Sequence, residues 1–265
     1  MNRKNVLSWI LNLGLVLLLV TACSTPQPAP TPTATPLPTA TPAPPTDTPT
    51  PETPEWDYVA LGDWPVMGMG DYSYAPHYAA YIEADMGVKV NLHIAGSPYQ
   101  TTDQLLEQLR NDQALRDQIS EAEVVTLVIG SLDMIEYIED PCYEEENWVD
   151  CTEKELASTF LPNYNAILDE LVTQCKSGLL IRTMTYPYVD ADWAYDKGDE
   201  RPLIKFLNES IIQVSAEHNI PVARVDIAFD GAEGLVTANG QSLLKPGAVK
   251  IAEAHRDLGY EPTVP

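Results

Sequence analysis

The sequence is poor in basic residues, cysteine and histidine, and each shortage limits what the protein can do. Its 265 residues include 15 Lys and Arg against 39 Asp and Glu, which gives a formal net charge of -24 at pH 7. A surface this acidic repels nucleic acid and anionic lipid headgroups. No Cys-x-x-Cys pair and no His-Glu-x-x-His run is present. We therefore expect no nucleic-acid partner, no cysteine- or histidine-based zinc site and no cofactor.

Residues 1–22 have the three parts of a bacterial signal peptide. Arg3 and Lys4 make the start positive, and residues 6–20 are largely apolar but short for a membrane span. Small residues then precede Cys23, which resembles the lipobox, whose cysteine receives a diacylglycerol. We expect Cys23 to anchor the mature chain to the cell membrane on its extracytoplasmic face; the alternative is an ordinary signal peptide with a chance cysteine. Without Arg3 and Lys4, 15 basic residues become 13, so against 39 acidic residues the mature chain carries -26.

A low-complexity segment, residues 23–55, follows the signal. After Cys23 it is almost wholly Ser, Thr, Pro and Ala, and it holds 12 of the 23 prolines. Such a composition cannot bury enough apolar surface to fold. It predicts an extended, polyproline-like tether. The remaining residues, 56–262, are enough for one sizeable domain.

Three further cysteines lie in that domain. Cys142 and Cys151 share one short acidic segment. Export implies an oxidising compartment, so we expect them to form a disulfide. Cys175 follows a predicted helix, and we expect it to be buried and unreactive.

From Trp56 onward, short aliphatic runs alternate with helical stretches. The expected strands are Tyr58–Leu61, Val88–Ile94, Val124–Ile129, Leu179–Thr185 and Val222–Asp226. The expected helices are Tyr74–Met86, Thr102–Leu109, Leu115–Glu121, Glu153–Gln174, Leu203–Glu217 and Gly247–Asp257. This alternation predicts an α/β sandwich with a parallel sheet of five strands.

The longest expected helix, Glu153–Gln174, has a sequence pattern for its start. Thr152 can cap it, and Glu155 completes a capping box. Pro162 predicts a bend near its beginning.

Ligands of such sheets bind beyond the carboxyl ends of the strands, so the residues there are the candidate site. Gly62-Asp63-Trp64 follows the first expected strand, and Gly96 ends the second. Gly130-Ser131-Leu132-Asp133 follows the third, and Asn239-Gly-Gln-Ser242 precedes the last helix.

In this order, these motifs resemble the sequence blocks of the SGNH/GDSL hydrolases, over residues 56–258. The resemblance implies a flavodoxin-like three-layer α/β/α sandwich. It aligns Asp63 with the aspartate of Gly-Asp-Ser, and Gly96 with a glycine whose N–H helps to form the oxyanion hole. The other positions depart from the family: Trp64 replaces the nucleophilic serine, Leu132 the asparagine, Asn239 the aspartate and Ser242 the histidine.

These replacements remove the groups that ester cleavage needs, namely an attacking hydroxyl, a base and an oxyanion donor. In a serine protease, loss of the nucleophile or the base alone lowers kcat on the order of a millionfold. We therefore expect a catalytically inactive domain that acts by binding or as a passive envelope lipoprotein.

The alternative is an active serine ester hydrolase, an esterase, lipase or carbohydrate deacetylase, with relocated catalytic residues. Its candidate nucleophiles are Ser73, Ser97 and Ser131, and its candidate bases are His77 and His93. The simpler interpretation makes the serines turn residues. His218 and His255, in or beside late helices, are expected on the surface, and Asp63 and Asp133 are expected to hydrogen-bond neighbouring loops.

Trp64 and Leu132 make the former active site more apolar, which allows two interpretations. In the simpler one Trp64 plugs a disused cleft, because a large aromatic side chain readily fills a small one. In the other, Trp64 and Leu132 join Tyr72, Tyr74 and Tyr99 in a surface that binds a cell-surface glycan or an acyl ligand.

Two acidic segments, residues 136–150 and 190–199, contain many carboxylates. Neither has the spacing of an EF-hand. We interpret both as solvated acidic faces and expect no metal site.

Overall fold

The computed structural model describes residues 53–66, 70–174, 176–188, 200–237 and 242–263. Several expectations concern residues outside these ranges. They are the signal and most of the tether, the anchor Cys23, the thiol of Cys175, the acidic segment 190–199 and the position of Asn239.

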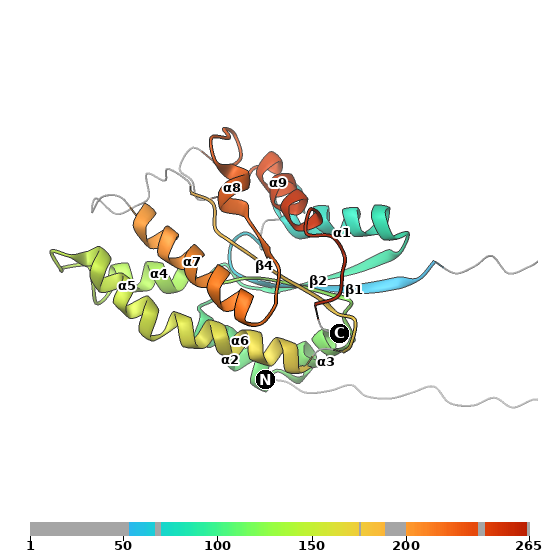
Figure 1. Ribbon diagram of the computed structural model, residues 1–265, viewed down its shortest axis with the longest axis horizontal. Coiled ribbons are helices and arrows are strands. Elements are labelled where there is room, and N and C mark those ends of the chain that lie inside the picture. The colour runs from blue at the N-terminus through green and yellow to red at the C-terminus, as the bar shows by residue number, and fades with distance from the viewer. Residues whose placement is uncertain (1–52, 67–69, 175, 189–199, 238–241, 264–265) are drawn as a thin grey trace, which may run out of the picture. The chain divides into compact units, whose positions relative to one another are not determined.

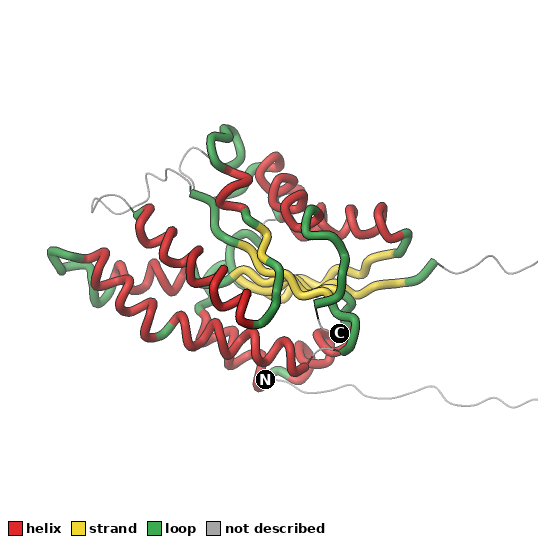
Figure 2. Tube along the Cα trace, in the orientation of Figure 1, coloured by secondary structure: helices red, strands yellow, loops and turns green. Residues whose placement is uncertain are grey.

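A five-stranded parallel sheet forms the centre of the domain, as Figures 1 and 2 show. Its strands run in the order β2-β1-β3-β4-β5. They are β1 (Glu55–Gly62), β2 (Lys89–Gly96), β3 (Val124–Val128), β4 (Leu180–Met184) and β5 (Val222–Ala223). Every residue of β3 and β4 is buried, which explains their continuous aliphatic runs. The predicted fold is confirmed.

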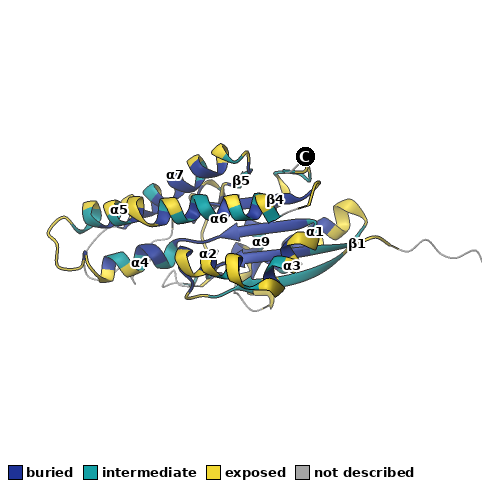
Figure 3. Ribbon diagram, turned by 90° about the horizontal axis from the view of Figure 1, so that it is seen from below, coloured by how far each residue is buried: buried dark blue, intermediate teal, exposed yellow. Residues whose placement is uncertain are grey.

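Helices cover both faces of the sheet (Figure 1). On one face lie α1 (Tyr74–Met86), α8 (Val225–Phe229) and α9 (Lys245–Arg256). On the other lie α2 (Thr102–Asn111), α3 (Gln113–Glu121), α6 (Phe160–Gln174) and α7 (Arg201–Glu217), with α4 (Ser131–Glu139) and α5 (Trp148–Ser158) beside them. In Figure 3, exposed residues mark the outer sides of α2 and α6. Within the described ranges, no helix combines the length and apolar content that crossing a bilayer requires.

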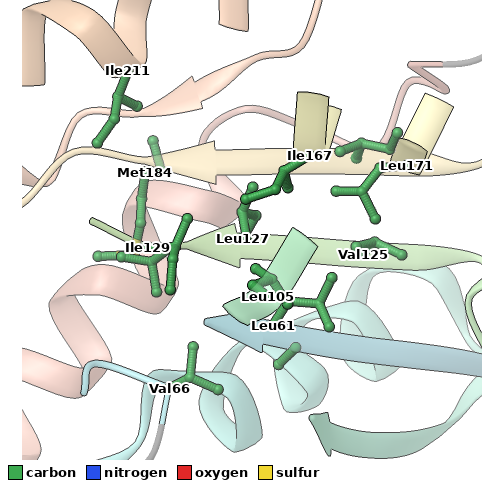
Figure 4. Close-up of a cluster of buried hydrophobic side chains, with 14 of the residues drawn as sticks. Leu61, Val66, Leu105, Val125, Leu127, Ile129, Ile167, Leu171, Met184 and Ile211 are labelled. Atoms are coloured by element: carbon green, nitrogen blue, oxygen red, sulfur yellow. The ribbon is translucent and has the colours of Figure 1, made fainter. Parts of the chain in front are cut away.

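The core between the sheet and α2 and α6 is built from interleaved aliphatic side chains, shown in Figure 4. Leu61 of β1, Leu127 of β3 and Ile167 of α6 are all fully buried. Burying a side chain of this size contributes roughly 1.5–3 kcal/mol. This core holds the strands in register and so fixes where their ends lie.

The single helix expected at Glu153–Gln174 is wrong, because the chain forms two helices there. A proline ring clashes with the carbonyl four residues earlier, and for Pro162 that residue is Ser158, the last of α5. Pro162 instead lies in the first turn of α6, where its missing N–H costs nothing. Thr152 is no cap: it lies inside α5, and its hydroxyl donates to the Trp148 carbonyl at 2.8 Å.

The last predicted strand is also wrong beyond Ala223, because Val225 begins α8. The side chain of Asp226 explains the turn. It accepts hydrogen bonds from Arg224 at 2.7 Å and from the Thr185 hydroxyl at 2.6 Å, which binds this segment to the end of β4. Helix α4 and a 3-10 helix, η1 (Gly70–Tyr72), were not predicted.

The expectation that His255 lies on the surface is wrong as well. Its side chain is fully buried in α9 and stacks on the ring of Tyr74 in α1, with centroids 5.1 Å apart. Burial lowers the pKa of His255 to about 3, so the ring is neutral near pH 7. The side chain acts as an aromatic packing group that joins α9 to α1.

The expected disulfide between Cys142 and Cys151 is present, with Cα atoms 5.6 Å apart. It connects the segment after α4 to the first half of α5. The two ends of that acidic segment are therefore covalently fixed.

Candidate functional site

The carboxyl ends of β1, β2 and β3 meet at a close backbone contact. Gly62 pairs with both Gly96 and Val128. A Cβ atom on Gly62, whose φ is +120°, would lie 1.6 Å from the Val128 carbonyl oxygen, and one on Gly96 would lie 2.2 Å from the Gly62 oxygen. Only glycine fits at these two positions. The three segments that follow β1, β2 and β3 therefore start close together, at this backbone contact.

Asp63 follows Gly62 directly, and its side chain is fully buried. Its Oδ2 accepts hydrogen bonds from the Ser131 N–H at 3.1 Å, the Ser131 hydroxyl at 2.7 Å and the Tyr186 hydroxyl at 2.5 Å. Burial raises the pKa of Asp63 to about 7, although these donors favour the charged form. The carboxyl joins the ends of β1, β3 and β4.

Asp133, in the first turn of α4, makes a second such connection. Its carboxylate accepts the Thr102 N–H at 3.0 Å and the Thr102 hydroxyl at 2.5 Å, at the start of α2. Burial raises the pKa of Asp133 to about 6. Both aspartates thus hold neighbouring segments together, and neither faces a histidine.

A pocket of about 670 Å³ opens above the strand ends, within the usual size range of small-molecule sites. Trp64 and Leu132 line it, together with Tyr99 after β2 and Ser242 before α9. Trp64 is only partly buried and packs against the core on one side. This geometry contradicts the interpretation of Trp64 as a plug, because the indole forms a wall of the pocket and leaves space beside it.

Of the three tyrosines expected in the ligand-binding surface, one lines the pocket and two do not. Tyr99 is 77% exposed and belongs to the pocket wall. Tyr72 is 53% exposed but does not line this pocket, and Tyr74 is fully buried, so it cannot contact a ligand there.

Sequence reasoning missed part of the wall. Ile204 and Leu207 of α7, and Tyr186 and Pro187 after β4, also line the pocket. No motif marks them. The only available pattern was the position of Tyr186 and Pro187 just beyond a strand end.

The candidate serines have structural partners. The hydroxyl of Ser73 caps α1 and donates to the Val66 carbonyl at 2.7 Å, inside the core. Ser97 accepts the Tyr99 N–H at 3.4 Å, as a turn residue does. Ser131 donates to Asp63, as described above.

The side chains of His77, His93 and His218 contact groups other than the candidate serines. His77 contacts the backbone oxygen of Asp71 at 3.0 Å, and His93 contacts the Asp57 carboxylate at 3.3 Å. His218, at the end of α7, reaches α6. Within the described ranges no serine hydroxyl hydrogen-bonds a histidine ring, and no group of three His, Cys, Asp or Glu side chains is placed to hold a metal ion.

Comparison with known proteins agrees with this fold. Residues 60–246 match the model of the GDSL-like Lipase/Acylhydrolase family. The chain belongs to this family. No curated protein matches it significantly. The matched range includes Gly62, Asp63 and Trp64, so the pocket wall that Trp64 forms lies within the GDSL-like domain.

Solved structures of the same architecture include three hydrolases. The lipase Lip_vut3 from a goat rumen metagenome is 20% identical with a TM-score of 0.62, covering 78% of this chain and 99% of that one. The lipase/acylhydrolase from Enterococcus faecalis is 20% identical with a TM-score of 0.56, covering 79% and 99%. The acetyl xylan esterase AlAXEase is 15% identical with a TM-score of 0.55, covering 77% and 99%. At these identities the likeness shows the shared GDSL-like fold.

The raised pKa of Asp63 predicts a pH dependence of stability. Between its usual value of 3.8 and about 7, folded Asp63 holds a proton that the unfolded chain releases. The contribution of Asp63 to the free energy of unfolding is therefore fully present below pH 3.8 and is lost as the pH rises through 7. Between pH 5 and pH 8 the wild type should lose roughly 2.5 kcal/mol more unfolding free energy than Asp63→Asn, which stays uncharged.

Urea unfolding at several pH values measures this difference. Asp257→Asn, an exposed position after α9, is the matched control and should keep the wild-type slope. Identical slopes in wild type and Asp63→Asn would show that this carboxyl does not change its protonation on folding.

Proposed function

We propose that this GDSL-like domain is a ligand-binding module without ester hydrolase activity, displayed outside the cell by a lipid anchor at Cys23. The observation that carries the proposal is the position of Trp64. It follows Gly62-Asp63, where the family resemblance places the nucleophile, and it lines a pocket that remains open.

Catalysis is disfavoured by the chemistry of this wall. The indole of Trp64 has no oxygen to attack an acyl carbon, and Leu132 offers no side-chain donor to an oxyanion. Ser242, aligned with the family's histidine, cannot take a proton near neutral pH. A pocket without the family's nucleophile and base keeps its capacity to bind and supports only weak residual acceleration.

Binding is favoured by the rest of the lining. Most of it is aromatic or aliphatic, including Trp64, Leu132 and Leu207, with few polar groups, which is typical of small-molecule sites. Aromatic rings stack on sugar rings and pack against acyl chains. Two of the structural neighbours are named as a lipase and an acetyl xylan esterase, which supports an acyl group or a glycan as ligand.

Trp64→Ala should weaken binding of such a ligand about tenfold, because a large aromatic wall residue contributes most of its contact energy. A glycan array and calorimetry with short acyl esters provide the measurement. Tyr72→Ala, which removes an exposed aromatic residue away from this pocket, is the control and should bind normally. Equal binding by wild type and both variants would refute the assignment of the pocket.

One observation favours a second candidate, a hydrolase with a relocated nucleophile. The Ser131 hydroxyl lines the pocket and donates to the Asp63 carboxylate at 2.7 Å, so this serine has a neighbouring base. A fluorophosphonate probe distinguishes the two functions. We expect no labelling, because Asp63 is buried and already accepts three donors. Labelling that Ser131→Ala abolishes, together with ester turnover, would establish the hydrolase instead.

The anchor is tested separately. Wild-type chain expressed in a bacterium should incorporate labelled palmitate and sediment with membranes, since two or more acyl chains anchor a protein stably. Cys23→Ser should lose the label and appear in the soluble exported fraction. An unlabelled wild-type chain in the soluble fraction would instead indicate an ordinary signal peptide.

A further inference from the structure

The charged side chains of the pocket wall are all acidic. Glu136 and Glu139 of α4 line it, both in exposed positions, and none of the described lining residues is Lys, Arg or His. Among the described lining residues, a bound anion would therefore meet acidic groups and no cationic partner. A cation would meet the carboxylate of Glu136.

The first N–H group of α4 is already hydrogen-bonded to a carboxyl of the protein. Helix N-termini attract anions through their unpaired N–H groups and their dipole. Here the N–H of Ser131, the first residue of α4, already points at Asp63 Oδ2, at 3.1 Å. Asp133 adds a second carboxyl in the same turn. The carboxyl of Asp63 therefore occupies the first N–H of α4, which a ligand carboxylate or phosphate would otherwise reach.

The aromatic part of the wall favours the same sign of charge. Trp64 and Tyr99 both line the pocket, and the face of an aromatic ring attracts cations, with Trp the most effective. Leu132 and Ile135 supply aliphatic surface beside them. Aromatic rings are the usual surroundings of bound quaternary ammonium groups.

We propose that the ligand of this pocket combines an apolar body with a cationic group, in particular a quaternary ammonium, and that anionic ligands are rejected. The inference rests on the proposed function, because it specifies the ligand of the same pocket. The strongly negative net charge of the chain adds a long-range attraction for cations.

Three probes of similar shape test the charge selection: benzyltrimethylammonium, benzyl alcohol and benzoate. The full chain is used with Cys23→Ser, which prevents lipidation. In calorimetry at low salt, we expect the cation to bind at least fivefold more tightly than the alcohol, roughly the size of one cation–π contact. Benzoate should bind more weakly than the alcohol. The advantage of the cation should fall as salt is added.

Two variants locate the effect. Glu136→Gln should weaken binding of the cation about threefold, the scale of one exposed charge pair, and leave the alcohol unchanged. Glu107→Gln makes the same change on the exposed side of α2 and should alter neither. Trp64→Leu should weaken the cation more than the alcohol, because leucine keeps apolar surface and removes the ring.

The outcomes separate the two proposals. If benzyl alcohol or benzoate binds as tightly as the cation, and Trp64→Leu weakens that binding, the charge selection is wrong and the binding function stands. If none of the three probes binds, the inference is overturned, and the glycan and acyl-ester measurements then decide the binding function independently.

Discussion

The close contact between the ends of β1, β2 and β3 is the constraint on which the candidate site depends. Two glycines, Gly62 and Gly96, allow backbone atoms to approach where any side chain would collide. The segments that follow these strands therefore diverge from one point and enclose the pocket between them. The contact itself requires only backbone geometry, so it does not depend on which side chains follow the strands.

Two apolar side chains, those of Trp64 and Leu132, follow the first and third strands. A large indole and a leucine stand where the family resemblance places a hydroxyl and an amide, and the wall becomes more apolar at both places. Meanwhile Asp63 remains buried, with Ser131 and Tyr186 as donors. The buried part of the site is therefore polar and hydrogen-bonded, whereas the pocket wall above it carries an indole and an aliphatic side chain.

The sequence allowed the sheet and the strand-end motifs to be predicted, because each depends on local pattern. Buried parallel strands appear as aliphatic runs, and residues such as Trp64 and Leu132 follow them directly. Other features depend on contacts between distant segments. The burial of His255 follows from its stacking on Tyr74, and the contribution of Leu207 to the pocket depends on how α7 packs. The break between α5 and α6 has a local cause, Pro162, but its exact location depends on the helical turn in which the proline lies.

Helix α4 is fixed at both ends, and this affects how the pocket can recognise a guest molecule. At its start, Ser131 and Asp133 are bonded to the ends of β1 and α2. Three residues beyond its last residue, Cys142 is covalently linked to α5. The helix that bears Glu136 and Glu139 is thereby preorganised, and little conformational entropy remains to be lost when a molecule enters. In the proposed binding function, a fixed pattern of charge and ring surface on this helix and beside it then discriminates between ligands.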